Sequence, residues 1–62
     1  MQGVSVYRAL YDYNATDCDE VSFSENDTIL LVDVIDADWM LGCVERTRCT
    51  GLVPCNYLQA VF

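Results

Sequence analysis

The sequence contains no histidine and no lysine, and its only basic residues are Arg8, Arg46 and Arg48. Without histidine, the serines and cysteines lack the side chain that most often serves as their general base. A chain of 62 residues buries only about 60% of its unfolded surface, which leaves no room for a deep catalytic cavity. We therefore predict that the protein is not an enzyme and that it acts through its surface.

Positive charge is scarce, since ten acidic residues and three arginines give a formal net charge of −7 at pH 7. Nine of the ten acids lie between residues 12 and 38, where there is no basic residue. Such a field repels nucleic acid and anionic lipid surfaces and favours cationic partners. The longest apolar run, residues 29–32, is too short to cross a bilayer, and residues 1–3 are not a charged leader. We expect neither nucleic-acid binding nor membrane insertion.

The four cysteines lack the C-x-x-C spacing of structural zinc sites, and no histidine is present to complete such a site. A small domain with four cysteines can instead form a disulfide framework, for which three pairings are possible. Free thiols in a reducing cytosol are the default for a chain without export features. We expect free thiols, no metal and no cofactor.

Alternating apolar residues predict five short strands, at 4–10, 29–34, 39–45, 50–53 and 58–61. No stretch repeats apolar residues at the helical period over three turns, so only a short helical turn is expected, at 54–57. Five short strands with acidic loops predict a small all-β barrel. The side chains expected to fill its core are Tyr7, Ala9, Val21, Phe23, Ile29, Leu31, Val53 and Leu58.

The connections between these strands differ in their chemistry. Residues 12–24 are polar and acidic, which predicts a long irregular loop whose returning arm is pinned to the core by Val21 and Phe23. Residues 25–27 read as a turn, because Asn26 tolerates a left-handed backbone. Residues 46–49 contain neither Gly nor Asn, so this hairpin turn is expected to be longer than two residues or slightly strained.

Four aromatic side chains remain once the core is filled: Tyr11, Tyr13, Trp39 and Tyr57. Each lies beside a predicted turn or the only proline, Pro54, which cannot donate to a strand ladder and so should mark a strand end. A surplus of aromatic residues with polar tips at strand ends is typical of a binding groove.

Four pieces of the sequence together resemble the Src homology 3 (SH3) domain family: residues 9–13 (ALYDY), residues 19–23 (DEVSF), Asp38-Trp39 followed by Gly42, and residues 51–58 (GLVPCNYL). They occur in that family's order and spacing, and the match extends over residues 7–61. The resemblance implies that residues 1–62 are a single SH3 domain from a larger multidomain protein. It also implies a five-stranded barrel of two packed antiparallel sheets with one short 3-10 turn, which binds proline-rich peptides without catalysis.

Within this family, segments such as 19–23 and 44–47 look similar to the nebulin and LIM-nebulin group of actin-associated scaffold proteins. That similarity implies a cytoplasmic, cytoskeleton-associated adaptor that works in signalling or as a scaffold. We expect the domain itself to be monomeric. The chain departs from the family pattern at a few positions, namely Asn26, Arg48, Cys49, Leu52 and Cys55.

The resemblance also assigns roles to individual residues. Tyr11 and Tyr57 would form one slot for a polyproline II helix, and Tyr13, Trp39 and Pro54 would surround the next. Trp39 and Asn56 would donate hydrogen bonds to ligand carbonyls. Glu20 would be the specificity carboxylate for an Arg or Lys flanking the prolines, with a bidentate contact to Arg. The assisting acids would be Asp17, Asp19 and Asp38, whereas Glu25, Asp33 and Asp36 are interpreted as solvated surface charges.

Two other functions fit parts of this pattern. An aromatic cage for methylated Lys or Arg peptides would also combine aromatic residues with acids, through cation–π attraction. Such a cage does not require residues 54–57 (PCNY), whereas a polyproline slot does. The third interpretation is an intramolecular docking domain, whose groove is filled by another part of a longer chain.

Overall fold

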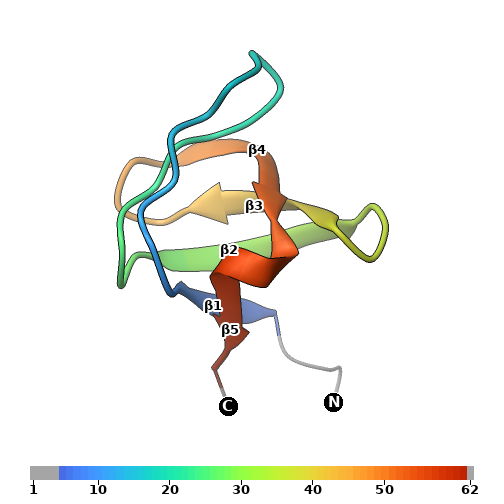
Figure 1. The fold of residues 1–62 in the computed structure, drawn as a ribbon. Coiled ribbons are helices and arrows are strands. Elements are labelled where there is room, and N and C mark those ends of the chain that lie inside the picture. Colours follow the sequence, from blue (N-terminus) through green and yellow to red (C-terminus); the bar gives the residue numbers. More distant parts are fainter. Residues whose placement is uncertain (1–4, 62) are drawn as a thin grey trace.

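The computed structural model describes residues 5–61, which fold into five strands and one short 3-10 helix (Figure 1). All five predicted strands are present, with bounds that differ from the prediction by up to two residues. The predicted residue Val4 lies outside the described residues. The elements are β1 (Val6–Ala9), β2 (Thr28–Val34), β3 (Trp39–Val44), β4 (Cys49–Pro54), η1 (Cys55–Tyr57) and β5 (Leu58–Ala60).

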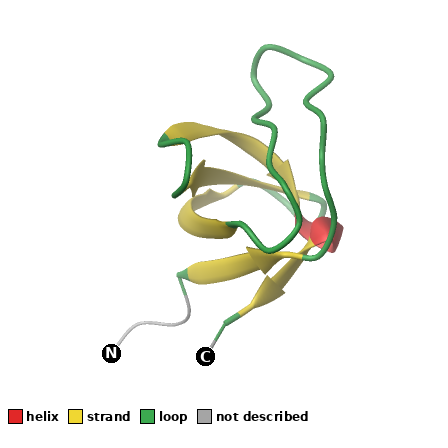
Figure 2. Cartoon of the chain, turned by 90° about the vertical axis from the view of Figure 1, so that its left-hand side faces the viewer, coloured by secondary structure: helices red, strands yellow, loops and turns green. Residues whose placement is uncertain are grey.

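Hydrogen bonds join the five strands into one antiparallel sheet in the order β4-β3-β2-β1-β5. Figure 1 shows β5 running across the direction of β2 and β3, so the sheet curls around the core. The two packed sheets expected from the sequence are therefore parts of one continuous sheet here. The long loop before β2 rises above the sheet as an irregular hairpin (Figure 2).

The core lies on the concave face of this sheet, and its most buried large side chains are Ile29, Val44 and Val53. Five of the eight predicted core residues are buried, and the other three are half-buried against the same cluster. Met40 and Val44 were not predicted. They alternate with Gly42 along β3, so all three face inward from a strand that lies between β2 and β4.

A β-bulge interrupts β2, since its register with β3 shifts between Leu31 and Asp33. A bulge bends the strand and adds one residue on one side of the ladder. Beyond it, β2 leaves the core, and Val32 and Val34 are 55% and 65% exposed. The second half of β2 therefore carries the following turn, residues 35–38, away from the core.

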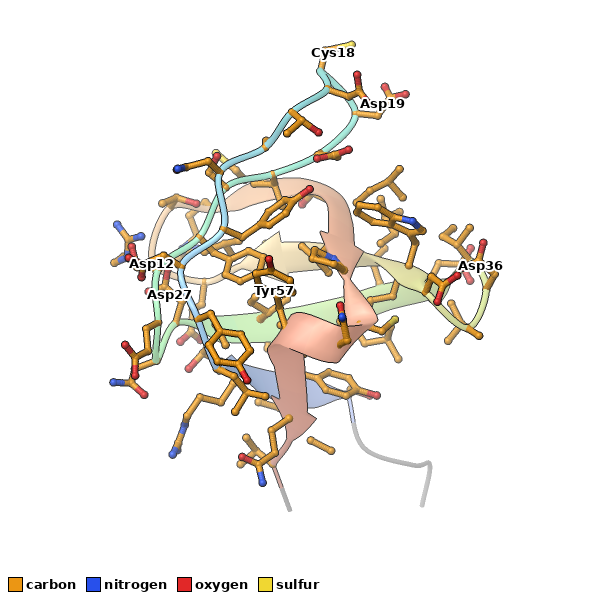
Figure 3. All side chains as sticks on the ribbon, in the orientation of Figure 1. Asp12, Cys18, Asp19, Asp27, Asp36 and Tyr57 are labelled. Carbon is orange, nitrogen blue, oxygen red and sulfur yellow. The ribbon has the colours of Figure 1, made fainter. Side chains whose placement is uncertain are left out.

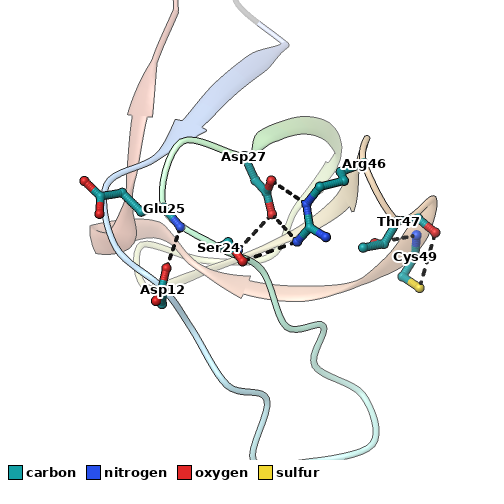
Figure 4. Close-up of polar contacts among 7 residues, drawn as sticks. All are labelled: Asp12, Ser24, Glu25, Asp27, Arg46, Thr47 and Cys49. Carbon is teal, nitrogen blue, oxygen red and sulfur yellow. Dashed lines mark hydrogen bonds and ion pairs between the residues drawn. The ribbon is translucent and has the colours of Figure 1, made fainter.

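The long loop is closed at its base by backbone hydrogen bonds and by one ion pair, between Asp27 and Arg46, which Figure 4 shows. The backbone N–H of Ala9 donates to the carbonyl of Asp27, and that of Asn26 donates to the carbonyl of Ala9, both at 2.9 Å. Asn26 has a φ of 73°, as the sequence predicted for this turn. The Asp27 carboxylate accepts hydrogen bonds from the Arg46 guanidinium, which ties the loop base to the β3–β4 hairpin.

The β3–β4 hairpin has a four-residue connection, residues 45–48, because Val44 pairs with Cys49. The backbone N–H of Arg48 donates to the carbonyl of Val44 at 2.7 Å, and Arg48 has a φ of 63°. A left-handed backbone is unusual for a residue other than Gly, Asn or Asp. The prediction of a longer and slightly strained turn is confirmed. Residues 5–61 contain no helix long and apolar enough to span a bilayer.

Candidate functional site

Three tyrosines form a ring cluster on the surface between the long loop and η1. Tyr57 lies at its centre (Figure 3), with the Tyr11 and Tyr13 rings meeting it edge-on at centroid distances of 5.4 and 5.3 Å. Tyr13 also stacks on the buried Phe23 at 5.5 Å. Edge-to-face and offset-stacked rings are favourable arrangements that fix ring orientation. The cluster thus extends from the core, through Phe23 and Tyr13, to Tyr11, which is 57% exposed.

Backbone pairing places these rings. The N–H of Leu10 donates to the carbonyl of Tyr57 at 2.7 Å, which brings the end of β1 against η1. Tyr13 and Phe23 exchange two backbone hydrogen bonds, at 2.9 and 3.0 Å, across the two arms of the long loop. The predicted alternation of Tyr11 and Tyr13 along an extended segment therefore puts both rings beside Tyr57.

Trp39 and Pro54 are cross-strand partners at the adjoining ends of β3 and β4. The indole is half-buried, and Asn56 in η1 is exposed, so both can be reached from solvent. Pro54 ends β4, as predicted, but it is buried and presents little surface of its own. No pocket is found in residues 5–61, so the aromatic cluster is an open, shallow surface.

The turn before Trp39 is held by Asp36. One carboxylate oxygen, Oδ1, accepts hydrogen bonds from the backbone N–H groups of Asp38 and Trp39, at 2.8 and 2.9 Å. The carbonyl of Asp38 in turn accepts a bond from the N–H of Cys55 at 2.8 Å, which ties this turn to η1. Asp36 is exposed, as expected for a solvated surface charge, and its carboxylate also orders the turn that presents Trp39.

Glu20 is half-buried on the returning arm of the long loop, where it pairs with Leu52 on the free edge of β4. Gly51 makes this approach possible, because a Cβ there would lie 2.9 Å from the carbonyl oxygen of Asp19. The Glu20 carboxylate accepts hydrogen bonds from the Tyr13 hydroxyl and from the backbone N–H and hydroxyl of Thr16. The Thr16 N–H, and then the Tyr13 hydroxyl, lower the pKa of Glu20, while the same carboxylate raises the pKa of Tyr13.

The other predicted acids, Asp17, Asp19 and Asp38, are exposed. Asp19 lies near the tip of the long loop, and Asp36 lies on the β2–β3 turn, so the two acids belong to separate segments (Figure 3). Within residues 5–61 the single ion pair joins Arg46 to Asp27. The exposed acids of the long loop and of the β2–β3 turn therefore keep their charge available to an external cation.

Two of the four cysteines, Cys18 and Cys55, lie close to this site. All four are free, and Cys18 is exposed at the loop tip. Cys55 is half-buried beside the site, where burial, followed by the charges of Asp36 and Asp38, raises the pKa of its thiol. A thiol with a raised pKa is less often ionised and so less reactive at neutral pH.

Thr16 is the site residue that the sequence did not predict. It lies on the outgoing arm of the loop, and its contacts to Glu20 depend on how the two arms pack. Its position four residues before the predicted specificity carboxylate was the only available signal.

The five-stranded fold and the aromatic surface are typical of one family of small domains, and a comparison with family models identifies the same family. A family model described as SH3 domain matches residues 8–55, so the chain belongs to the SH3 domain family. Members of this family are non-catalytic interaction modules. A similar solved structure is the C-terminal SH3 domain of myosin IB from Entamoeba histolytica, bound to EhFP10(GEF) peptide. It has a TM-score of 0.85 and 29% identity, with all of both chains covered.

Two curated relatives indicate a group within the SH3 family. The chain is 59% identical over 54 residues to the LIM and SH3 domain protein Lasp of Drosophila melanogaster, and 52% identical over 56 residues to human nebulin. These matches cover 87% and 90% of this chain, but only 8% and 1% of the two relatives. The predicted similarity to the nebulin and LIM-nebulin group of actin-associated scaffolds is confirmed.

Proposed function

We propose that this domain binds proline-rich segments of other proteins that carry an Arg or Lys beside the prolines. The observation that carries the proposal is the tyrosine cluster, in which Tyr57 holds Tyr11 and Tyr13 edge-on at 5.4 and 5.3 Å. A polyproline II helix has three residues per turn and regularly spaced ridges, and aromatic-lined surfaces bind such helices. The structurally similar myosin IB SH3 domain is bound to a peptide, which supports peptide binding by a domain of this fold.

Electrostatics supports the cationic part of the ligand. The domain has a net charge of −7, and exposed acids lie on both the long loop and the β2–β3 turn, which are the segments next to the aromatic residues of the site. Carboxylates without internal cations attract a basic side chain and set the direction in which the peptide lies. An open surface of this size belongs to weak interfaces, for which a Kd in the micromolar range, about −8 kcal/mol, is expected.

The relatives suggest the cellular setting. Residues 1–62 would form one monomeric interaction domain within a larger multidomain protein. That protein would work in the cytoplasm as a scaffold or adaptor associated with the actin cytoskeleton, by analogy with Lasp and nebulin.

The single tryptophan tests the proposal directly. Trp39 is half-buried at the edge of the site, so its fluorescence should change when an Arg-flanked P-x-x-P peptide is titrated. A control peptide with alanine at the proline positions should give no change in fluorescence.

A substitution in the ring cluster tests the same proposal. Replacing Tyr11 by Ala should weaken peptide binding about tenfold, as for an aromatic anchor. Replacing the similarly exposed Val32 by Ala, away from the ring cluster, should not weaken it. A Trp39 signal that stays constant at millimolar peptide would overturn the proposal.

An aromatic cage for methylated lysine is the competing function, and the same assay separates it. A trimethyl-lysine peptide without proline should leave the fluorescence unchanged. An aromatic cage needs rings arranged around a central space for the cation. The three tyrosines instead pack edge-to-face on one another, which favours polyproline binding.

A further inference from the structure

The two carboxylate oxygens of Glu20 are used unequally. Oε1 accepts from the Tyr13 hydroxyl, from the backbone N–H of Thr16 at 3.0 Å, and from the Thr16 hydroxyl at 3.1 Å. Oε2 has only a longer contact of 3.3 Å to the same Thr16 hydroxyl. That hydroxyl carries one proton and cannot serve both oxygens fully at once. Oε1 is therefore saturated, whereas Oε2 keeps free acceptor capacity.

Thr16 supplies two of the three donors, and the surrounding backbone fixes both ends of this contact. On the Glu20 side, the N–H of Leu52 donates to the carbonyl of Asp19 at 2.8 Å, and the N–H of Val21 donates to the carbonyl of Leu52 at 3.2 Å. On the Thr16 side, the N–H of Ala15 donates to the Ser22 hydroxyl at 2.9 Å. With the two arms tied in this way, the Thr16 contacts select the orientation of the carboxylate.

We infer that Thr16 is a positioning residue that turns Oε1 of Glu20 inward and leaves Oε2 for the ligand cation, so that the site accepts Lys as readily as Arg. This inference rests on the proposed peptide-binding function for the existence of that cation. It deepens that function by stating what the site recognises, which is positive charge rather than the shape of a guanidinium.

The chemistry of the two cations explains the consequence. Arg gains over Lys where its planar fork meets two oxygens in a bidentate contact. A carboxylate with one free oxygen offers a single N–H···O bond, which an ammonium makes equally well. The bidentate contact expected from the sequence would need a second oxygen from another acid, such as Asp17 or Asp19 on the same loop.

The hydrogen bonds also keep Glu20 ionised, because they lower its pKa. The titratable side chains around it are Tyr13 and Asp17, with Tyr57 beyond Tyr13, and the facing strand contributes the apolar Leu52. Replacing Thr16 by Val removes the hydroxyl donor and keeps the backbone N–H. The pKa of Glu20 should then rise, so that binding of a basic peptide is lost at a higher pH on acidification.

The experiment compares Thr16→Val with the rescue Thr16→Ser and with a matched control, Thr50→Val, at an exposed position of β4. Three proline-rich peptides are used that differ only in a flanking Arg, Lys or Gln. The unsubstituted domain should bind the Arg and Lys peptides within about threefold of each other. Thr16→Val should weaken both basic peptides about twofold, because the Glu20 charge and the Thr16 backbone N–H remain, and leave the Gln peptide unchanged. Thr16→Ser and Thr50→Val should retain the original affinities.

Two results would overturn the inference. An equal loss for the Gln peptide in Thr16→Val would show a merely structural role, and a preference for Arg over Lys of about tenfold or more would show a second acceptor oxygen. If none of the three peptides binds the unsubstituted domain, the proposed function has failed. The role of Thr16 is then decided by NMR titration of the Glu20 carboxyl carbon, where an unchanged pKa in Thr16→Val refutes it.

Discussion

Glu20 and Asp27 lie on the same loop and have similar hydrogen-bonding environments, but their charges are balanced differently. Asp27 accepts bonds at 2.8 Å from the Ser24 N–H and from two nitrogens of Arg46, and it is only 9% exposed. Glu20 is half-buried, and its donors, from Tyr13 and Thr16, are all neutral. The pKa of each carboxyl is lowered, but only that of Asp27 is lowered chiefly by an internal cation.

This difference separates a structural acid from a binding acid. Arg46 neutralises Asp27, so the pair joins the loop base to the β3–β4 hairpin and has no charge left for a ligand. The neutral donors around Glu20 orient it and favour its ionised form without cancelling its charge. A carboxylate that is fixed, ionised and without an internal cation is suited to meet a cation from outside.

The largest effect should come from breaking the structural pair. Asp27→Asn keeps the size of the side chain but turns an amide N–H₂ toward a guanidinium donor or the Ser24 N–H. Because these bonds involve a nearly buried charge, the free energy of unfolding should fall by about 1 to 3 kcal/mol, toward the lower end because Arg46 is 57% exposed. Urea denaturation followed by Trp39 fluorescence measures this change.

The matched control is Glu20→Gln, the same chemical change on the same loop. It should lower the urea midpoint less than Asp27→Asn does, because its donors are neutral, and weaken binding of Arg- or Lys-flanked peptides about two- to fivefold, the effect expected of an exposed ion pair. Asp27→Asn should leave the affinity of the folded domain unchanged. If the two substitutions affected stability equally, the separation between structural and binding acid would be wrong.

The contribution of the Asp27–Arg46 pair to the free energy of unfolding should depend on pH. Arg46 lowers the pKa of Asp27 in the folded domain, so the stabilisation is complete above the ordinary carboxyl pKa of about 3.9 and is lost as the pH falls through the lower folded value. The difference in unfolding free energy between the unsubstituted domain and Asp27→Asn should be constant above about pH 5 and shrink below about pH 4. Taking this difference cancels the relief of repulsion among the other acids. A difference that stays constant down to pH 3 would contradict the assignment.

The alternation of apolar residues and the turn chemistry predicted most of the fold. Strand positions, the left-handed Asn26 and the pinning of the loop by Val21 and Phe23 all depend on neighbours within a few residues. The surplus of aromatic residues likewise predicted Tyr11, Tyr13 and Tyr57, and the structure brings these three rings together.

The features that were missed depend on contacts between distant segments. Met40 and Val44 alternate as core residues should, but their burial follows from the central place of β3 in the sheet. Asp27 and Arg46 are 19 residues apart, and nothing local marks them as partners. The bulge in β2 depends on pairing with β3, and the burial of Pro54 depends on the packing of β4. The pattern of residue types along a single sequence does not show which distant segments will contact one another.

The β3–β4 turn offers the smallest effect, through the backbone strain of a residue close to Arg46. Arg48, two residues away, has a φ of 63°, which is strained for a residue with a Cβ. Arg48→Gly relieves this strain but gives the unfolded chain more freedom, so a net stabilisation of about 0.5 kcal/mol is expected. A higher urea midpoint than that of the unsubstituted domain would show this stabilisation.

The matched control is Glu45→Gly, in the same turn but without a positive φ, which should lower the urea midpoint. A lower midpoint for Arg48→Gly would mean that the Arg48 side chain contributes more than its backbone strain costs.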